Sequence, residues 1–598
     1  SINDTIEIVN QYAGLSGTYT IGGDAPDFET IGEAVLALNN GGASAPVTFN
    51  IRSGTYLETI IINDFAGSDC DRPVIFQSES GDSSLVTITN LGINAHTIVL
   101  NGADGVHFKN MTLKSVNTAF RHVVLFSGGA HCNQFEGNTF KGFQSTATAN
   151  TSAVIRSTAG LDTANVIINN RIMDGSYSIH LTGNGGGITH TVITGNHLEP
   201  YFTGIYNSVL QGVTISHNTI IADNHTSGQG LEILTGHNLI EISYNKIMVP
   251  LGQYGIVLEN CDNTTNNRGR IYNNFVTVGG TSVARGIYLN GCAFQDILHN
   301  NILVYSTNTT LANTAPLYIN NSPDIRIRNN ATRNAGPGYA IYANGNTTFV
   351  ANRNSYHTAG TTFGFWNGGA AETTFTNWQT ASGQDANSLN VNPAFMSNTD
   401  LHTFLVLLNE AGDPTTGIAD DIDGQQRDSM PDIGADEFDP LPSNDAGIFM
   451  FAGPHIPFAA GNKPVNLVIK NFGGNALTSA TVKWTVNGIE QTPFNWTGNL
   501  PSAICDTFQV GNYVFDELIA YTIDAWTEMP NGVPDATPDN DLFSTGVFYA
   551  SLAGTYTVGG FAPDFNLVSD LETILNTAGI VNNVTFQFRP GEYVEALS

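Results

Sequence analysis

A six-residue pattern of apolar and polar positions recurs through the middle of the chain. Each copy reads apolar, two variable residues, Asn, one variable residue, apolar, as in ISHNTI at Ile215–Ile220 and ISYNKI at Ile242–Ile247. The nine copies decay toward the end of the series, and their Asn residues are spaced by 22 to 32 positions. These residues are Asn138, Asn170, Asn196, Asn218, Asn245, Asn274, Asn300, Asn330 and Asn352. A second short apolar segment, such as GIYLNG at Gly286–Gly291, precedes most copies.

Short β-strands that return at this interval, without a helical period, are typical of a parallel β-solenoid. One coil cannot bury its apolar face alone, whereas stacked coils share a continuous core. We expect each Asn side chain to bond the backbone at a bend and the Asn of the next coil, at the strand spacing of about 4.8 Å. The nine Asn residues then form a structural ladder along a solenoid of roughly 12 to 14 coils. The segment Gly32–Gly42 is predicted to be an amphipathic cap on the first coil.

The pattern changes after the Pro-rich segment Asp439–Asp445. The chain then carries alternating apolar and polar residues in runs such as NLVIKNF and ATVKWTVNG, at the spacing of a β-sandwich. Trp484 is predicted to pack at the centre of this sandwich. We therefore expect an all-β chain, with a right-handed parallel β-helix over residues 16–439 and an immunoglobulin-like sandwich over residues 440–552.

The two ends of the chain repeat each other. GTYTIGGDAPDF at Gly17–Phe28 returns as GTYTVGGFAPDF at Gly554–Phe565, and 25 of 56 aligned residues are identical at an offset of 537. Residues 1–15 then correspond to the last strand of a preceding sandwich, and residues 553–598 to the start of a further β-helix. We expect the sequence to be a section of a longer tandem array.

Three features together resemble secreted right-handed parallel β-helix proteins of the Bacteroidota. They are the Asn-containing coils, the W-x-x-x-S-G-x-D-x-x-S element at Trp378–Ser388, and the DIDG…R…DIGADEF segment that ends at Phe438. In that family such helices often alternate with CARDB or immunoglobulin-like modules in very long surface proteins. The resemblance covers most of the chain and implies an extracellular, cell-surface location reached by type IX secretion. Members range from adhesins to enzymes of polysaccharide breakdown, so it does not imply one activity.

The charge of the chain narrows the classes of partner. The 598 residues include 52 acids and 21 bases, which gives a net charge of −31. That balance argues against a nucleic-acid binder, which needs a basic surface, and against docking on an anionic membrane. No run of 18 apolar residues predicts a membrane span, and the first residues do not resemble a signal peptide.

The five cysteines are too few and too widely spread along the sequence to predict a disulfide framework, and no CxxC motif occurs. We expect them to be small buried residues. The alternative is a bridge between Cys261 and Cys292, if these residues stack one coil apart.

Parallel β-helices include pectin lyases and polygalacturonases, so catalysis has to be considered. The GHG and RIK elements of the galacturonase family do not occur in the sequence, and the Asn-containing region has no acid cluster of the kind that pectate-lyase chemistry needs. The best remaining pair is Glu232 and Glu259, two strand positions apart on consecutive coils and roughly 8 Å from each other, a separation that suits an inverting glycosidase. The alternative is that both are solvated or Asn-capped surface acids.

A column of polar and aromatic residues precedes the ladder in three coils. His217, Tyr244 and His299 each stand directly before a ladder Asn. They are expected either to line a sugar-binding face or to point outward as ordinary turn residues.

Two acidic loops favour calcium, the one cofactor that the sequence suggests. Asp421, Asp423 and Asp428 are hard oxygen ligands around a Gly turn, although the Glu of an EF-hand is missing. Asp535, Asp539 and Asp541 form a second case. For both loops a simple acidic turn is the alternative.

Three tripeptides resemble the O-glycosylation motif of the Bacteroidota. They place candidate glycans on Thr5, Thr163 and Ser429.

We expect a non-catalytic extracellular protein in which tandem units form a surface fibre or adhesin. The reason is the tandem repeat together with the missing catalytic motifs, since reach and avidity benefit from repeated copies. Neighbouring copies of the repeat are then its partners, and surface glycans are further candidates. The alternatives are a polysaccharide-processing enzyme, either a lyase or a glycoside hydrolase, and a carbohydrate-binding β-helix.

Overall fold

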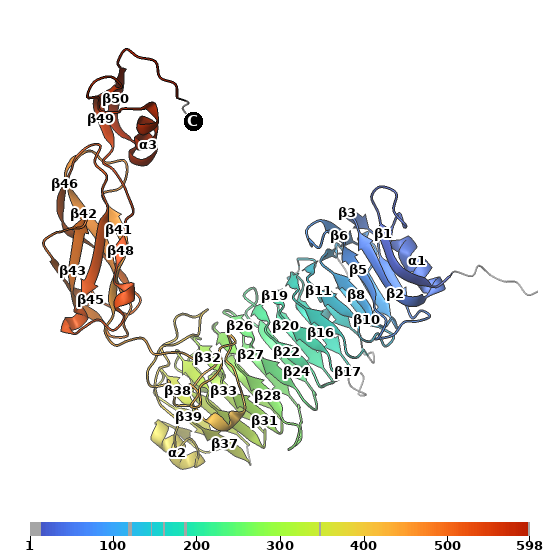
Figure 1. Cartoon of the computed structure of the whole chain (residues 1–598). Coiled ribbons are helices and arrows are strands. Elements are labelled where there is room, and N and C mark those ends of the chain that lie inside the picture. The colour runs from blue at the N-terminus through green and yellow to red at the C-terminus, as the bar shows by residue number, and fades with distance from the viewer. Residues whose placement is uncertain are drawn as a thin grey trace, which may run out of the picture. The chain divides into compact units, whose positions relative to one another are not determined.

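The structure is a computed structural model of the chain (Figure 1). It describes residues 13–595, except residues 118–121, 145, 159–161, 184–187 and 346–347. The chain divides into two compact units, Ser1–Phe438 and Asp439–Ser598. Most of the sandwich strand predicted over residues 1–15 lies outside the described residues, and Leu15 already belongs to the first strand of the solenoid.

The first unit is a parallel β-solenoid in which successive coils add strands to three long sheets. The first sheet contains β1 (Leu15–Ile21), β2 (Ala43–Ile51), β5 (Val74–Ser78), β8 (Val106–Lys109), β11 (Gln134–Glu136), β14 (Val166–Ile168), β18 (Val192–Thr194), β22 (Thr214–Ser216), β25 (Glu241–Ser243), β28 (Gly269–Tyr272), β31 (Gln295–Leu298), β34 (Ile325–Arg328) and β37 (Phe349–Asn352). The second contains β4 (Ile60–Asn63), β7 (His96–Asn101), β10 (His122–Ser127), β13 (Ile155–Ser157), β16 (Tyr177–Thr182), β20 (Thr203–Ser208), β24 (Gln229–Leu234), β27 (Tyr254–Glu259), β30 (Ala284–Asn290), β33 (Thr314–Asn320), β36 (Ile341–Asn344), β39 (Gly364–Trp366) and β40 (Ala371–Glu372). The third contains β3 (Gly54–Leu57), β6 (Val86–Thr89), β9 (Thr112–Lys114), β12 (Thr139–Lys141), β15 (Arg171–Met173), β19 (His197–Glu199), β23 (Thr219–Ile221), β26 (Lys246–Val249), β29 (Phe275–Val278), β32 (Asn301–Val304), β35 (Ala331–Asn334) and β38 (Ser355–Thr358). A short pair, β17 (Ile188–Thr189) and β21 (Leu210–Gln211), lies outside these sheets.

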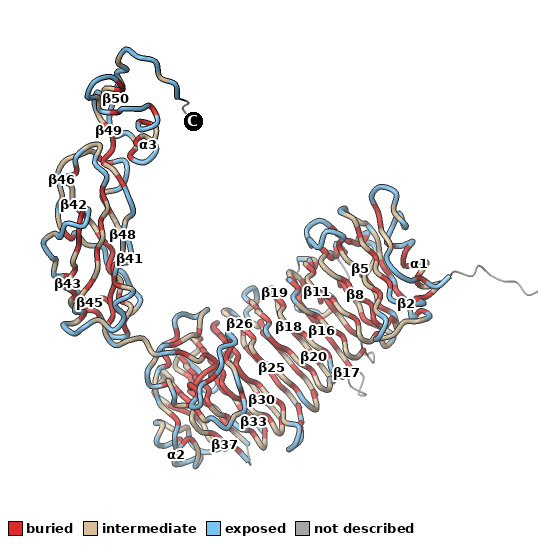
Figure 2. The backbone as a smooth tube through the Cα atoms, in the orientation of Figure 1, coloured by how far each residue is buried: buried red, intermediate tan, exposed pale blue. Residues whose placement is uncertain are grey.

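Inward-facing apolar side chains fill the space between the three sheets. Buried positions recur along the coils (Figure 2). Ile193, Ile215 and Ile242 pair in register on successive strands, and each is fully buried. In the first coils the same inward position holds aromatic rings, and Phe49 stacks on Phe76 with 4.7 Å between ring centroids. Each coil thus covers the apolar face of the one before it, as the periodic pattern predicts.

The asparagine ladder lies between the first and third sheets. The Nδ2 of Asn245 donates to the Ile215 carbonyl at 2.9 Å and to Asn274 Oδ1 at 3.0 Å. Its Oδ1 accepts from the backbone N–H and from the Nδ2 of Asn218, both at 3.0 Å. The same contacts join consecutive ladder residues from Asn138 to Asn330. The ladder therefore satisfies buried backbone groups at every bend.

The prediction that Asn352 is the last ladder residue is wrong, because Asn354 occupies that position. The backbone N–H of Asn330 donates to Asn354 Oδ1 at 2.9 Å, and Asn354 is fully buried, whereas Asn352 is only partly buried. The register gives the reason, since Ile327 pairs with Ala351. A small Ala thus stands at the inward position where the pattern led us to expect a large apolar residue.

Two helices lie at the two ends of the solenoid. Helix α1 (Ile31–Gly41) covers the first coil, close to the predicted cap, and buries Ile31, Val35 and Leu38 among others. Glu58 fixes its start, because the carboxylate accepts from the backbone N–H groups of Ile31 at 3.2 Å and Gly32 at 2.6 Å. An acid at a helix N-terminus also complements the helix dipole.

Helix α2 (Phe375–Ser382) covers the last coils and explains the W-x-x-x-S-G-x-D-x-x-S element. Trp378 and Asp385 are buried, and the indole Nε1 donates to Asp385 Oδ2 at 2.9 Å. Ser388 Oγ donates to the other carboxylate oxygen and accepts from the backbone N–H of Asn354 at 2.9 Å. The element therefore ends the ladder by replacing a further Asn with a buried carboxylate and a hydroxyl.

One disulfide joins Cys70 to Cys132, contrary to the expectation that the cysteines are unpaired. These residues are 62 positions apart in the sequence, but their Cα atoms are 5.4 Å apart because the solenoid stacks their loops. Sequence distance is thus a poor guide to cysteine contacts in a repeat fold. Cys261 and Cys292 do lie on neighbouring coils, but both are free, and Cys292 Sγ accepts from the backbone N–H of Cys261 at 3.4 Å.

We predict that the double variant Cys70→Ser/Cys132→Ser lowers the free energy of unfolding of the solenoid by about 2–4 kcal/mol, because the bridge restricts the unfolded chain. Urea unfolding with and without reductant measures this loss. Adding reductant to the wild type is expected to reproduce it, whereas Cys505→Ser, at an exposed free cysteine, is expected to leave stability unchanged. Equal stability of the double variant and the wild type would contradict the prediction.

The second unit begins with a β-sandwich of two antiparallel sheets. One sheet contains β41 (Ala446–Gly453), β42 (Gly461–Asn471) and β46 (Cys505–Phe515). The other contains β44 (Ile489–Glu490), β43 (Leu477–Val486), β47 (Ile523–Glu528) and β48 (Phe543–Ser544), with β45 (Phe494–Leu500) also paired to β43. Trp484 lies in the core, as predicted, together with Trp496.

The second unit ends with the elements that open the first one. Strand β49 (Leu552–Val558), helix α3 (Val568–Ala578) and strand β50 (Ile580–Phe588) each begin 537 residues after β1, α1 and β2. Glu595 binds the backbone N–H groups of Val568 at 3.2 Å and Ser569 at 2.8 Å, as Glu58 does at α1. The repeat in sequence is therefore a repeat of one capped β-α-β structure, down to its side-chain contacts.

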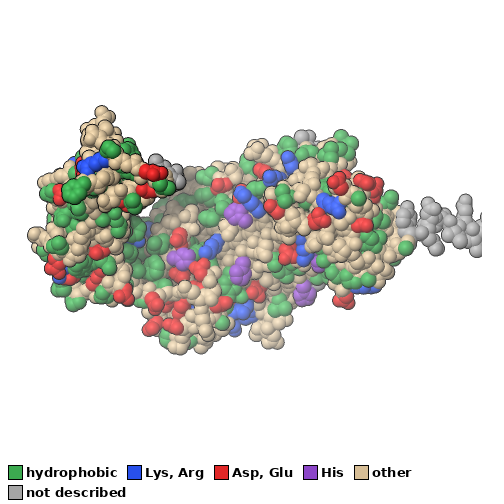
Figure 3. Space-filling view, turned by 45° about the horizontal axis from the view of Figure 1, so that its top comes forward, with side chains coloured by type: hydrophobic (Ala, Val, Ile, Leu, Met, Phe, Trp, Pro, Cys, Tyr) green, Lys and Arg blue, Asp and Glu red, His purple; other side chains and the backbone are tan. Residues whose placement is uncertain are grey.

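No helix among the described residues is both long and apolar enough to cross a membrane. On the face shown in Figure 3, acidic, basic and histidine side chains are interspersed among uncharged ones. The excess of acids is thus spread over that face instead of forming one patch.

Candidate functional site

The outer face of the second sheet carries a column of polar side chains. Arg156, His180, Tyr206 and Glu232 occupy the same register position on four successive strands, β13, β16, β20 and β24. The rings of His180 and Tyr206 stack with centroids 4.4 Å apart. Burial lowers the pKa of His180 to about 4, and so does the nearby charge of Arg156. His180 is therefore neutral at physiological pH.

Glu232 and Glu259, the two candidate catalytic acids, lie on this same face. Glu232 pairs with Val257 and Leu234 pairs with Glu259, so the two acids are two strand positions apart on adjacent strands. Burial, and then the negative charge of Glu259, raise the pKa of Glu232 to about 7. A protonated acid beside a second carboxyl group is the pairing that an inverting glycosidase uses. The geometry permits that chemistry without identifying a substrate.

We predict that Glu232→Gln stabilises the solenoid at pH 8 by about 1–2 kcal/mol and has little effect at pH 4.5, with the full pKa shift discounted for partial exposure. The folded-state pKa of Glu232 lies above its unfolded value, so its stabilising effect is present below pH 4.5 and is lost as pH rises toward 7. Urea unfolding at both pH values tests this. The exposed acid Glu29, changed to Gln, serves as control. A destabilising effect of Glu232→Gln at pH 8 would contradict the prediction.

A half-buried group of aromatic rings continues this face on the following coils. The guanidinium of Arg285 lies 3.5 Å from the ring centroid of Tyr318 and 4.7 Å from that of Tyr288. Tyr318 stacks on Tyr342 at 4.0 Å, and Tyr342 stacks on Phe365 at 4.8 Å. We call Glu232, Arg285, Tyr288, Tyr318 and Tyr342 the outer aromatic face. Such rings, flanked by a cation and an acid, suit contact with a sugar.

The column of His217, Tyr244 and His299 does not form a sugar-binding face. His217 and Tyr244 stack at 4.6 Å, and the Tyr244 hydroxyl donates to Asp420 Oδ1 at 2.5 Å. His299 is fully buried, with its Nδ1 3.1 Å from the Gly434 carbonyl oxygen. The chain that follows α2 contacts Tyr244 and buries His299, whereas His217 is exposed, so the three residues do not share one free surface.

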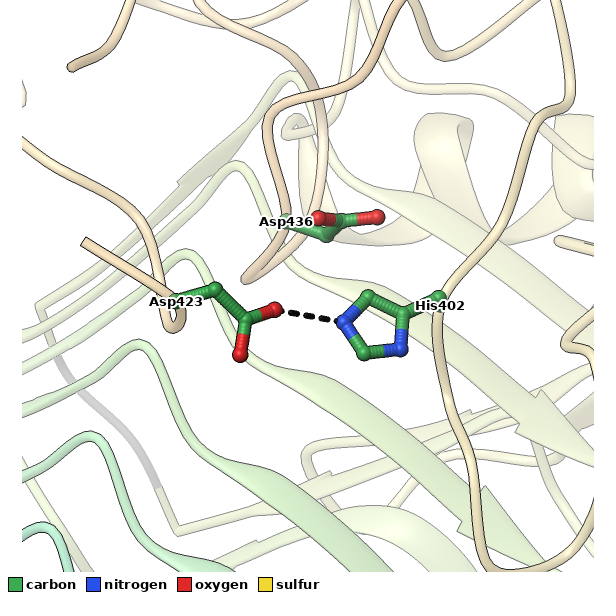
Figure 4. A group of neighbouring side chains, drawn as sticks. All are labelled: His402, Asp423 and Asp436. Carbon is green, nitrogen blue, oxygen red and sulfur yellow. Dashed lines mark hydrogen bonds and ion pairs between the residues drawn. The ribbon is translucent and has the colours of Figure 1, made fainter. Parts of the chain in front are cut away.

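This covering chain, residues 384–438, lies along the outer side of the third sheet. Its Leu401, Leu408 and Ile433 pack with Phe275 and Leu303 of the coils. It brings His402, Asp423 and Asp436 together, with His402 Nε2 2.6 Å from Asp423 Oδ2 (Figure 4). One possible ligand atom from each residue lies within 4.8 Å of the others. The sequence pattern points to Asp423 but not to His402 or Asp436, because only the path of this segment brings them together.

The His402 cluster is largely satisfied by its own residues. His402 contacts Asp400 through Nδ1 and Asp423 through Nε2, and Lys246 lies 3.2 Å from Asp423 Oδ1. Although burial opposes it, the two carboxylates raise the pKa of His402. Burial raises the pKa of Asp436 to about 7. His402 thus lies between two carboxylates, one on each ring nitrogen. A metal such as Zn²⁺, which accepts mixed nitrogen and oxygen ligands, would have to displace the protons of this cluster.

The predicted calcium ligands Asp421, Asp423 and Asp428 are not brought together. Asp421 is fully buried, and its carboxylate accepts from the backbone N–H groups of Asp423, Gln425 and Glu437. Asp428 is exposed, and only Asp423 of the three joins a potential metal group. Asp421 thus fits the acidic-turn alternative, because its carboxylate holds the backbone N–H groups of a tight loop, whereas Asp423 contacts His402 and Lys246 instead.

The candidate glycosylation sites lie in different surroundings. Thr5 lies outside the described residues. Thr163 is partly buried, its Oγ1 is 2.8 Å from His131 Nδ1, and the preceding Asp162 is buried. Ser429 is exposed. Of the two described sites, Ser429 is the accessible one, and its modification stays a prediction.

No protein-family model matches the sequence, and no curated protein matches it significantly. Among solved structures, a CARDB domain from Pyrococcus furiosus in complex with di-metal ions is similar over 17% of this chain and 89% of its own, with 19% identity and a TM-score of 0.14. A periplasmic alginate epimerase is similar over 55% of this chain and 77% of its own, with 12% identity and a TM-score of 0.32. XylC in complex with xylose is similar over 83% of this chain and 100% of its own, with 10% identity and a TM-score of 0.39. Similarities at this level concern the fold alone.

Proposed function

We propose that the chain is a section of a secreted cell-surface protein of the Bacteroidota type, in which solenoid and sandwich units follow one another in tandem as a non-catalytic fibre or adhesive rod. The observation that carries the proposal is the second capped β-α-β structure, β49–α3–β50. A capped coil of this kind buries its apolar face only when another coil stacks on it. In the first unit Val47 and Phe49 are fully buried against β5, whereas their counterparts Val584 and Phe586 are partly exposed.

The proposal is tested by exchanging the two caps. Residues 15–58 are replaced by residues 552–595, so that β49–α3–β50 has to support the coils of the first unit. We expect the exchanged chain to unfold cooperatively, with a midpoint in urea close to that of the wild type. A matched control with Glu595→Ala in the exchanged cap is expected to be less stable, since the first N–H groups of α3 lose their acceptor. An exchanged chain whose solenoid does not fold would contradict the proposal.

We infer glycan binding at the outer aromatic face as a second function, which gives a rod of this kind an adhesive surface. The supporting observation is the stack of Tyr318 and Tyr342 beside Arg285, on the same sheet face as the acid pair. Aromatic rings contribute contact area at a low entropic cost, and Arg285 offers donors for sugar hydroxyl or carboxylate groups.

A glycan array with alginate, pectin and xylan oligosaccharides tests this second function. Binding is expected for the wild type, to fall at least tenfold in Tyr318→Ala, and to persist in Tyr201→Ala, which lies outside the face. If the wild type released shortened oligosaccharides and Glu232→Gln did not, the face would be catalytic and not only a binding surface. Equal binding by the wild type and Tyr318→Ala would refute glycan binding at this face.

A further inference from the structure

Three carboxylates meet at one end of the β-sandwich, although they are far apart in sequence. Asp445 directly precedes β41, Asp535 lies between the short 3-10 helices Pro530–Gly532 and Pro538–Asn540, and Asp541 directly follows the second of these. One carboxylate oxygen from each lies within 4.8 Å of the others. Two oxygens that each lie 2.4 Å from a shared ion are at most 4.8 Å apart, so this spacing accommodates a common cation.

Two of these acids are buried with unused oxygen atoms. Asp445 is 2% exposed and Asp541 is 6% exposed. The Oδ1 atoms of both are buried and have no hydrogen-bond partner among the described residues, and the same holds for Oδ1 of the adjacent Asn540. Among the described residues, none of the three acids forms an ion pair with a basic side chain. The ion pair of the sandwich joins Lys483 to Glu528.

Backbone contacts hold the cluster in place. Asp535 Oδ2 accepts from the backbone N–H of Ala446 at 3.0 Å, and its Oδ1 accepts from that of Thr537 at 2.8 Å. The Ile448 N–H donates to the Asp541 carbonyl at 3.0 Å. These bonds fix the start of β41 against the segment that leads into β48. The backbone therefore holds the three acids close together although their charges repel.

Such an arrangement is costly unless a cation neutralises it. A buried carboxylate without a partner loses its hydration, and a second carboxylate nearby adds repulsion. Burial, and next the charge of Asp535, raise the pKa of Asp541 to about 7. A positive ion removes both penalties and uses the unpartnered oxygens as ligands.

We propose that Asp445, Asp535 and Asp541 bind a calcium ion. The donors are all hard oxygen atoms, which favours Ca²⁺ over the softer metals that prefer nitrogen or sulfur. From the sequence we grouped Asp539 with Asp535 and Asp541, but Asp539 is exposed and lies outside the cluster. The third member is instead Asp445, which precedes Asp535 by 90 residues. The ion would join the first strand of the sandwich to the segment before its last strand.

The test uses the full chain, freed of metal with EDTA and titrated with CaCl₂ in a calorimeter. Asp445→Asn and Asp541→Asn are each expected to weaken one calcium site at least a hundredfold. Asp539→Asn, an acid of the same segment, is the matched control and is expected to bind as the wild type does. His402→Gln, a second control, is also expected to leave this site unchanged, which separates it from the cluster in the solenoid.

Thermal unfolding provides a second readout that does not depend on the affinity of a variant. Calcium is expected to raise the melting temperature of the wild-type sandwich. In EDTA, Asp541→Asn is expected to melt at or above the wild-type temperature, because it removes a buried charge that has no partner. The proposal is overturned if the wild type binds no calcium at millimolar concentration, if Asp445→Asn and Asp541→Asn bind as the wild type does, or if Asp541→Asn is unfolded in EDTA.

Discussion

Changing Asn245 or Asn354 to Ala is expected to lower the free energy of unfolding of the solenoid by about 3–5 kcal/mol, because each change leaves two or more buried polar groups without partners. In Asn245→Ala the groups that lose a partner include the Ile215 carbonyl and the backbone N–H of Asn218. Urea unfolding followed by far-UV circular dichroism measures the loss.

Asn352→Ala is the matched control for the ladder. Asn352 lies only two residues from Asn354 but outside the ladder, so its replacement is expected to cost less than about 1.5 kcal/mol, as for a single partly exposed hydrogen bond. If Asn352→Ala were as destabilising as Asn354→Ala, the register assigned to the last coils would be incorrect.

Arg427→Met is expected to destabilise the solenoid unit by about 3–5 kcal/mol, because it leaves a buried carboxylate without its counter-charge. Arg427 Nη1 lies 2.9 Å from Glu437 Oε2, and both side chains are almost completely buried. The same guanidinium donates to Asn273 Oδ1 at 2.9 Å and to the Gly434 carbonyl at 3.1 Å. It therefore fastens residues 384–438 to the coils, and its loss is expected to expose that segment.

Urea unfolding and limited proteolysis test this prediction together. The variant is expected to be cleaved within residues 400–438 at protease concentrations that leave the wild type intact. Arg171→Met removes a similar pair, with Glu199, from the surface, where Arg171 is 56% exposed, and is expected to cost less than about 1 kcal/mol. Wild-type stability and protease resistance of Arg427→Met would show that the segment is held by its apolar contacts alone.

The coils were predictable because their pattern is local. The apolar residues and the Asn of each copy lie within six positions, and every coil repeats the same environment. The prediction failed where one coil departs from the pattern, at Asn352, since a small Ala351 fills the inward position. The cap was predictable for the same reason, because the amphipathic pattern of Gly32–Gly42 is local.

The candidate sites were predicted less well because they depend on which distant segments meet. Glu232 and Glu259 were found because adjacent coils fix their spacing. The bridge from Cys70 to Cys132, the contact of His402 with Asp423, and the place of Asp445 beside Asp541 all require the paths of loops that have no periodic signal. The acids of the DIDG segment suggested calcium, whereas Asp421 accepts hydrogen bonds from backbone N–H groups and Asp428 is exposed outside the group.

The most direct test of tandem assembly is to complete the second solenoid with the chain's own sequence. Because the repeat offset is 537, residues 62–439 are appended directly after Ser598, and the product is measured by small-angle X-ray scattering and urea unfolding. Thirteen coils at the strand spacing make a solenoid about 60 Å long. We expect the maximum dimension to increase and the solenoid unfolding amplitude to roughly double at an unchanged midpoint. An appended segment that stays unfolded, or a maximum dimension that does not increase, would contradict tandem assembly.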